Sequence, residues 1–317
     1  MDFRAQEAGS MYVKLQAAHI PVDVVYEADI EQRGLAGYQV VALPGCRVLP
    51  RHIYDAIHDF AKSGGTVIAD QHLVAQLPNV ITIPQQHSSW QPGDKLQEEW
   101  TTTAPRIRKQ LGGKVERWAD CDSPSVALST LTDGTNRLLF STNLLMQPGD
   151  YLGGWGKVLD DGTPQQVDLS ISRHDCVIYD VLHQRQIEPQ IKDGRLNWNI
   201  SLGSGEGKMF AVLPASIQRI DVVVPDVVTK LDRCAAEISI RSTQGDLIQG
   251  LIPLYITIRD SQGTIPDFSD YSYADGGKAK LSFPIAINEP TGVWRVDVQD
   301  LYSGTVGQTF FQVNGSK

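Results

Sequence analysis

The residues best placed for chemistry are Cys46, Asp70 and His72, each of which follows a short apolar run. Residues 39–43 lead through Pro44-Gly45 to Cys46, and residues 66–69 lead directly to Asp70-Gln71-His72. Such runs are typical of buried parallel strands, and open α/β sheets usually carry their sites at the carboxyl ends of those strands. A thiol, a carboxylate and an imidazole could supply a nucleophile with its base, or part of a metal site.

A helix must lie between the two runs to bring their ends to one edge. Pro50 suits the start of a helix, because its missing N–H costs nothing there. Ile53, Ile57 and Ala61 follow on one helical face, and Gly64-Gly65 suits the end. Residues 38–72 therefore predict a right-handed strand–helix–strand crossover.

Cys46 is weighed first as a nucleophile. A catalytic cysteine needs a base within hydrogen-bonding reach and a lowered pKa, and His52 lies on the following helix. The surrounding residues nevertheless lack the two glycines of a sharp nucleophile turn. The sequence favours a loop thiol, with a small hydrolase or amidotransferase-like enzyme using Cys46 or Asp70 as the rival hypothesis.

A metal site is the second possibility. Asp70 and His72 share one side of an extended segment, and His174-Asp175 offers further ligand types, but no third ligand is evident beside either pair. Cys46, Cys121, Cys176 and Cys234 are scattered, with no C-x-x-C spacing. Gly112-Gly113 and residues 203–207 match no phosphate-binding loop. We expect neither a metal nor a cofactor.

Tryptophan could stack on sugar rings, although burial is its commoner use. Five tryptophans could serve such a role: Trp90, Trp100, Trp118, Trp155 and Trp198. Trp155, flanked by glycines, and Trp198 are the carbohydrate-binding candidates.

Composition narrows the class of protein. The chain has 317 residues, which suggests two or three domains, and its net charge of −9 argues against a nucleic-acid partner. No apolar run is long enough for a membrane helix, and the first residues show no signal-peptide pattern. The cellular location stays open.

Read in order, the chain predicts an α/β domain over residues 1–121, a flavodoxin-like or amidotransferase-like open parallel sheet. Helices are expected at 5–19 and 103–111, and further strands at 22–26 and 80–83. Such a sheet normally opens with a strand before its first helix. That strand is missing here, so we expect the chain to be the C-terminal part of something longer or a truncated gene product.

From residue 122 the apolar period changes to two. A hairpin is predicted over 126–143 with its turn at Asp133-Gly134, inside a β-sandwich that extends over 122–216. Residues 217–317 show seven further short strands, which indicates an immunoglobulin-like sandwich with Trp294 in its core.

These stretches resemble known families. GYQVVALPGCRVLPRHIYDAIHDFAKSGGTVIADQ resembles the class I glutamine amidotransferase-like domain of certain β-galactosidases, where it serves trimerisation. TDGTNRLLFSTN and DGRLNWNISLGSGEGKMFAVLP are similar to the C-terminal β-domains of glycoside hydrolases. The last stretch, from PLYITIRDSQG onward, is similar to bacterial immunoglobulin-like or macroglobulin-type modules.

The departures from those families exclude their chemistry here. The amidotransferase nucleophile would follow residues 66–69, where Asp70 stands, and no histidine has glutamate two residues later. A glycosidase barrel of about 250 residues has no room in this chain. The resemblance thus implies a non-catalytic accessory region of a glycoside hydrolase, serving oligomerisation or domain spacing. Its expected partners are a second copy of the chain or a catalytic glycosidase domain; a carbohydrate-binding module is the other alternative.

Overall fold

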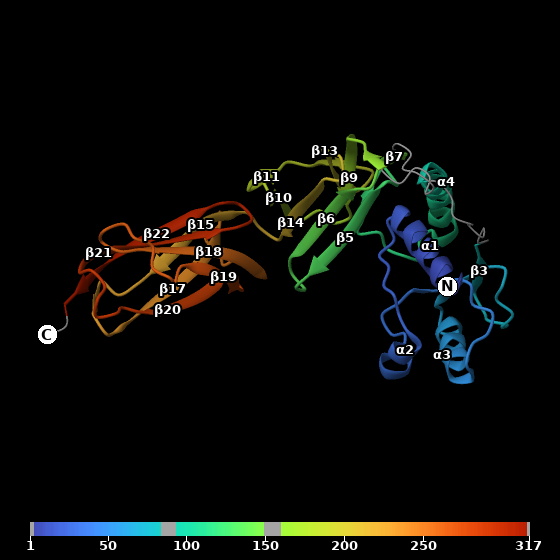
Figure 1. Cartoon of the computed structure of the whole chain (residues 1–317), viewed down its shortest axis with the longest axis horizontal. Coiled ribbons are helices and arrows are strands. Elements are labelled where there is room, and N and C mark those ends of the chain that lie inside the picture. Colours follow the sequence, from blue (N-terminus) through green and yellow to red (C-terminus); the bar gives the residue numbers. More distant parts are fainter. Residues whose placement is uncertain (1–2, 84–92, 149–159, 316–317) are drawn as a thin grey trace, which may run out of the picture. The chain divides into compact units, whose positions relative to one another are not determined.

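The structure is a computed structural model that describes residues 3–83, 93–148 and 160–315. Strands provide most of the regular structure, as the two predicted β regions require (Figure 1). No described helix is both long and apolar enough to cross a membrane.

The first 111 residues hold the helices of the described chain and one sheet of parallel strands. The helices are α1 (Phe3–Ala17), α2 (Glu27–Arg33), α3 (Arg51–Lys62) and α4 (Gly93–Leu111). The strands are β1 (Val40–Leu43), β2 (Thr66–Ala69) and β3 (Val80–Thr82). They form one parallel sheet in the order β1-β2-β3. The predicted crossover is present as β1, α3 and β2.

The apolar face of α3 and the glycine after its last turn explain why the crossover forms. Ile53, Ile57 and Ala61 are the buried face of α3 and pack with Val67 of β2. Gly64 ends the helix with a φ of 106°, a conformation that side chains with a Cβ rarely adopt. The central strand β2 is buried along its whole length, so it anchors this region.

Two predictions for this region are wrong in detail. Residues 22–26 are not a strand, because no neighbouring strand pairs with them, and Val24 and Tyr26 are exposed. The acidic stretch that follows forms α2, whose start is capped where the Asp29 carboxylate accepts the Tyr26 N–H at 3.0 Å. The helix predicted at 103–111 begins ten residues earlier, at Gly93. The parallel sheet β1-β2-β3 therefore has three strands among the described residues. A wider, flavodoxin-like sheet is not confirmed.

The middle of the chain forms antiparallel sheets. Its strands are β4 (Ala119–Cys121), β5 (Val126–Thr132), β6 (Arg137–Asn143), β7 (Met146–Pro148), β8 (Asp160–Gly162), β9 (Gln165–Ile171), β10 (Val177–Asp180), β11 (Arg185–Ile187), β12 (Gln190–Lys192), β13 (Arg195–Leu202) and β14 (Gly207–Leu213). They pair in the orders β11-β10-β14-β6-β5, β12-β13-β9-β4 and β7-β8. The predicted hairpin is confirmed as β5 and β6. Its turn is tied by the Asp133 carboxylate, which accepts the N–H groups of Thr135 and Asn136 at 2.8 and 2.7 Å.

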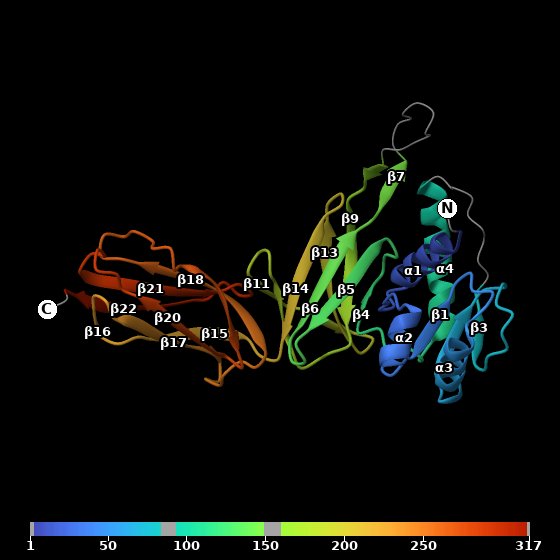
Figure 2. The same ribbon diagram turned by 60° about the horizontal axis from the view of Figure 1, so that its bottom comes forward.

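The last hundred residues form an eight-stranded sheet that is antiparallel except for one pair, β16 with β22. Its strands are β15 (Ile217–Val223), β16 (Val227–Thr229), β17 (Arg233–Ser242), β18 (Leu251–Arg259), β19 (Asp270–Asp275), β20 (Lys278–Pro284), β21 (Gly292–Asp300) and β22 (Val306–Asn314). Seven match predicted runs, and β16 is additional. Strands β19 and β20 pair at Asp275 and Lys278, where the sheet turns, so β15-β17-β20 and β19-β18-β21-β22-β16 form two faces (Figure 2). Trp294, Phe283 and Phe311 are buried between them.

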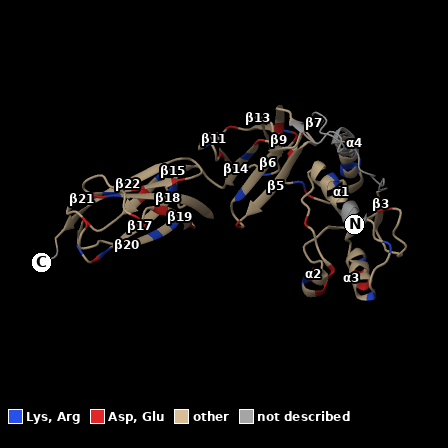
Figure 3. Ribbon diagram, viewed as in Figure 1, with Lys and Arg blue, Asp and Glu red and all other residues tan. Residues whose placement is uncertain are grey.

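The chain divides into two compact units. One contains residues 1–129, 141–172 and 199–207, and the other contains 130–140, 173–198 and 208–317. Acidic and basic residues are interspersed along the ribbon of each unit (Figure 3). The three-domain division by sequence stays a prediction.

Candidate functional site

Asp70 holds together the two loops at the carboxyl ends of β1 and β2. It is only 3% exposed. Its Oδ2 accepts the Gly45 N–H at 2.5 Å, and its Oδ1 accepts the His72 N–H at 2.8 Å. Both carboxylate oxygens thus accept backbone N–H groups, that of Gly45 buried and that of His72 partly buried. Asp70 thus lies close to the loops that carry Cys46 and His72, and its carboxylate links these loops through hydrogen bonds.

Cys46 and the nearby histidines each have a polar contact in these loops. The Cys46 thiol donates to the Val48 carbonyl, with 3.6 Å between sulfur and oxygen. The His52 Nε2 lies 2.6 Å from the Glu31 carboxylate of α2, and the His72 ring lies 3.2 Å from the Gln71 amide. His52 therefore pairs with a carboxylate on another helix. These contacts stabilise the loop conformations.

Replacing Cys46 with serine should leave the thermal midpoint nearly unchanged, because the substitution keeps a small donor in a half-exposed loop. The expected loss of unfolding free energy is below about 0.5 kcal/mol. Cys121→Ser is the comparison, since it places a hydroxyl in a buried site and should cost about 1–3 kcal/mol. Differential scanning fluorimetry of both variants measures this, and a larger loss for Cys46→Ser would show that the thiol matters.

A second cluster, not predicted from the sequence, surrounds Asp120 at the start of β4. Its carboxylate lies 2.8 Å from Nδ1 of His19, 2.6 Å from Arg117 and 3.3 Å from Arg108. The other ring nitrogen of His19 lies 3.0 Å from the Val126 carbonyl. Arg108 of α4 also donates to the Ala18 carbonyl at 3.1 Å. The cluster thus joins the ends of α1 and α4 to β4, and α1 and α4 lie side by side (Figures 1 and 2).

The backbone of His19 shows why this residue is special. It ends α1 with a φ of 52°, in the left-handed region where glycine is usual. The N–H of His19 donates to the Gln16 carbonyl, and the N–H of Ile20 donates to the Leu15 carbonyl, at 2.8 and 3.0 Å. This is the Schellman pattern of helix ends. Histidine adopts it here at a conformational cost, and its ring gains the bonds of the cluster.

The electrostatics of the cluster favour an ionised carboxylate. Burial pushes the pKa of Asp120 upward and is the largest single influence, but the His19 hydrogen bond and the charges of Arg108 and Arg117 together hold this pKa below its usual value. Burial lowers the pKa of Arg108, and the Asp120 charge opposes that effect. Asp120 and its two arginines therefore form a partly buried cluster of charged side chains, to which His19 is hydrogen-bonded.

Cys121 stands next to Asp120, so a cysteine–histidine–aspartate nucleophile has to be considered. It is the Cys121 backbone N–H that faces His19, at 3.3 Å, whereas the thiol lies 3.7 Å from the Asp122 carboxylate. Burial raises the pKa of this thiol to about 12. A thiol with that pKa supplies almost no thiolate at neutral pH, so the cluster stabilises the fold and does not activate a nucleophile.

The remaining candidates lie elsewhere. Trp198 is 6% exposed on β13 and packs edge-on against Phe210, with ring centroids 5.4 Å apart. A sugar could stack on it only if this core opened. Trp155 lies outside the described residues. His174 and Asp175 lie in an exposed turn before β10. No three His, Cys, Asp or Glu side chains gather as a metal site within the described ranges.

Comparison with known proteins gives distant likenesses only. No family model matches the chain. No curated protein matches it either. It is similar to α-L-fucosidase isoenzyme 2 from Paenibacillus thiaminolyticus, at 14% identity and a TM-score of 0.43, over 64% of this chain and 44% of that protein. It is also similar to the exo-carrageenase GH42 from Bacteroides ovatus, at 13% identity and a TM-score of 0.39, over 65% and 26%.

A shorter likeness involves a protein of another class. The superoxide reductase (neelaredoxin) from Ignicoccus hospitalis matches 31% of this chain and 82% of its own, at 9% identity and a TM-score of 0.21. The chain spans less than half the length of the two glycosidases above. Likenesses with TM-scores below 0.5 are too distant to assign an activity.

Proposed function

We propose that this chain is a non-catalytic accessory region of a carbohydrate-active enzyme and serves oligomerisation or domain spacing. The resemblance of residues 37–71 to a trimerisation domain motivates the proposal. The roles found for Asp70 and Cys121 agree with it, since the first binds backbone donors and the second has a strongly raised thiol pKa. The main support for the proposal is the outer edge of β1, where backbone N–H groups point away from the sheet.

The outer edge of β1 offers backbone groups for pairing. The Thr66 N–H donates to the Gln39 carbonyl at 3.0 Å, which sets the alternation of the parallel ladder. The N–H groups of Val40 and Ala42 therefore point away from β2. All four residues of β1 are half-buried, whereas those of β2 are fully buried. An apolar strand with such an edge is a template for a strand of another chain.

The partner of this edge would be a second copy of the chain or a catalytic glycosidase domain. In a two-fold dimer, β1 would meet the same strand of its partner in antiparallel orientation, because an isologous contact joins identical surfaces. Residues 40–43 are uncharged and β-branched or apolar, which suits them to such pairing. The assembly would then continue the three-stranded sheet across the contact.

Ala42→Pro should abolish this assembly, because proline removes an N–H that points outward and leaves the bonds to β2 intact. Thr82→Pro on β3 is the matched control: the Ile83 N–H donates to the Ala69 carbonyl, so the Thr82 N–H also points away from β2, on the opposite edge. Size-exclusion chromatography with light scattering over a range of concentrations measures the effect. A strictly monomeric parent chain, or equal loss in both variants, would contradict the proposal.

A further inference from the structure

A cavity of about 740 Å³ opens at the amino ends of β1 and β2. Its walls come from the loop at 34–39, the end of α3, the Gly64-Gly65 turn and Lys114. This is the opposite end of the strands from Cys46 and Asp70, so the cavity is separate from the predicted site. Its volume is within the range of small-molecule sites, about 300–1,000 Å³.

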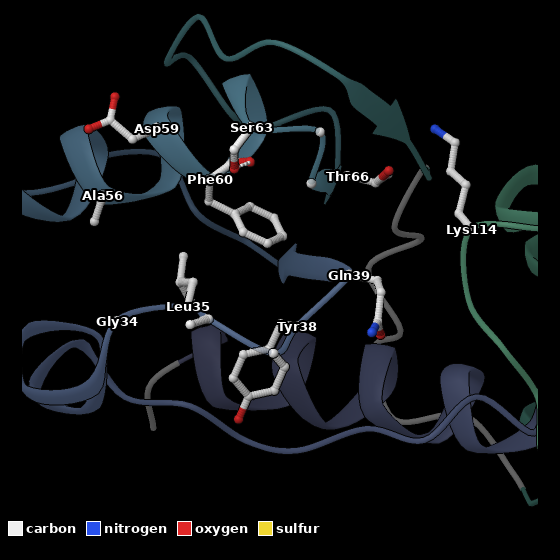
Figure 4. A pocket seen from close by; sticks show the side chains of 14 residues that line it. Gly34, Leu35, Tyr38, Gln39, Ala56, Asp59, Phe60, Ser63, Thr66 and Lys114 are labelled. Carbon is white, nitrogen blue, oxygen red and sulfur yellow. Dashed lines mark hydrogen bonds between the residues drawn. The ribbon is translucent and has the colours of Figure 1, made fainter.

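Two aromatic residues line the cavity, Phe60 of α3 and Tyr38 of the opposite loop. Figure 4 shows the ring of Phe60 extending into the space, whereas the ring of Tyr38 extends away from Phe60. The Tyr38 hydroxyl lies 3.5 Å from the Asp23 carboxylate, and the residue is 38% exposed. Phe60 lies directly against Gly65, where any Cβ would overlap the ring, so the backbone of the turn fixes its position. Phe60 therefore gives the cavity one flat apolar surface, and Tyr38 forms part of its rim.

Polar groups lie at the two ends of this aromatic pair. Gln39, Thr66 and Lys114 lie at one end, and Asp59 lies at the other (Figure 4). Within the part of the chain that the structure describes, neither the Gln39 amide nor the Lys114 ammonium has a hydrogen bond or an ion pair. These groups are therefore available as donors and acceptors for a ligand. The lining carries one carboxylate and one ammonium, so its formal charge is zero.

We propose that this cavity binds a neutral sugar ring. A pyranose presents C–H groups on its faces and hydroxyl groups around its edge, and each hydroxyl both donates and accepts. One face matches the ring of Phe60, with Tyr38 at the rim, and the hydroxyl belt matches Gln39, Asp59 and Lys114. A charged ligand fits less well, because the lining has no excess charge and the carbonyl end of α3 disfavours anions. This binding needs a single chain, so it goes beyond the assembly proposed above.

The test titrates the full chain with methyl β-galactoside, methyl β-glucoside and phenylacetate, and follows binding by ligand-observed NMR. We expect at least one glycoside to bind and phenylacetate not to bind. Gln39→Ala and Lys114→Met should each weaken binding by about 3–10-fold, the loss typical of one hydrogen bond. Tyr38→Ala should abolish it, and circular dichroism checks that this variant folds.

Lys109→Met is the matched control, because Lys109 is exposed on α4 and does not line the cavity. Absence of glycoside binding overturns the proposal, as does binding of phenylacetate alone. Binding that survives Tyr38→Ala and Lys114→Met also overturns it, since the sugar would then lie elsewhere. A chain that is monomeric at every concentration and still binds a glycoside would reject the assembly proposal and keep this one.

Discussion

Trp294→Ala should lower the free energy of unfolding of the second unit by about 3–5 kcal/mol, the usual cost of removing a large buried aromatic side chain. Trp294 is fully buried on β21. It pairs across the sheet with Phe311, with ring centroids 5.9 Å apart, and its Nε1 donates to the Pro290 carbonyl at 3.0 Å. Alanine would leave a cavity between the two faces and an unpaired carbonyl beside it.

The matched control for this change is Val293→Ala. Val293 precedes Trp294 on the same strand, points to the opposite side and is 57% exposed. Its truncation should change stability by less than about 0.5 kcal/mol. Hydrogen exchange of the full chain, read by mass spectrometry on peptides from β17, β21 and β22, localises the loss to this domain. Equal effects of the two substitutions would show that Trp294 does not anchor the core.

Asp120→Asn should destabilise the first unit by about 2–3 kcal/mol at pH 7. The expected value lies below the cost of breaking a fully buried pair, because the Asp120 side chain is 21% exposed. The substitution leaves Arg108 and Arg117 without the carboxylate that compensates them. Asp55→Asn is the control, because it removes the same kind of pair, with Arg51, on an exposed surface of α3 and should have little effect.

The pH dependence of this difference follows from the lowered pKa of Asp120. Because the pKa is lower in the folded state, the ionised carboxylate stabilises the fold at any pH above the pKa of the unfolded state, which is about 3.9. That contribution is lost as the pH falls below about 4 and through the folded pKa. Urea unfolding of the parent and of Asp120→Asn should therefore show a gap that is full at pH 6–7 and closes in acid. If the difference in unfolding free energy between the two chains did not change with pH, the charge of Asp120 would not be the cause of its stabilising effect.

The sequence predicted the parts of the fold that local patterns determine. The hairpin of β5 and β6 agrees with its predicted limits, because alternating side chains and an Asp-Gly turn define both strands locally. The buried position of Trp294 followed from the same alternation. Residues 22–26 show the limit of this reasoning: their valines favour a strand, but a strand needs a neighbour, and the pattern does not say whether one is present.

Local sequence patterns could not predict contacts between residues that are far apart in the chain. His19 and Asp120 are 101 residues apart, and no spacing rule connects them. The only local signal was a histidine at the last residue of a predicted helix, two residues before Pro21. Strand β16 was missed because three residues are too few to show alternation. The cavity beside Phe60 also required the structure, since its walls come from loops and turns that carry no motif.

The pairing of β16 with β22 has a mechanical consequence. These two strands are parallel, with Val227 opposite Gln312, Val228 opposite Val313 and Thr229 opposite Asn314. A pull applied between residue 226 and residue 314 acts along both strands in opposite directions, and loads the hydrogen bonds of this pair in shear. The bonds then share the load together, whereas a pull on the two open ends of an antiparallel hairpin breaks them one after another.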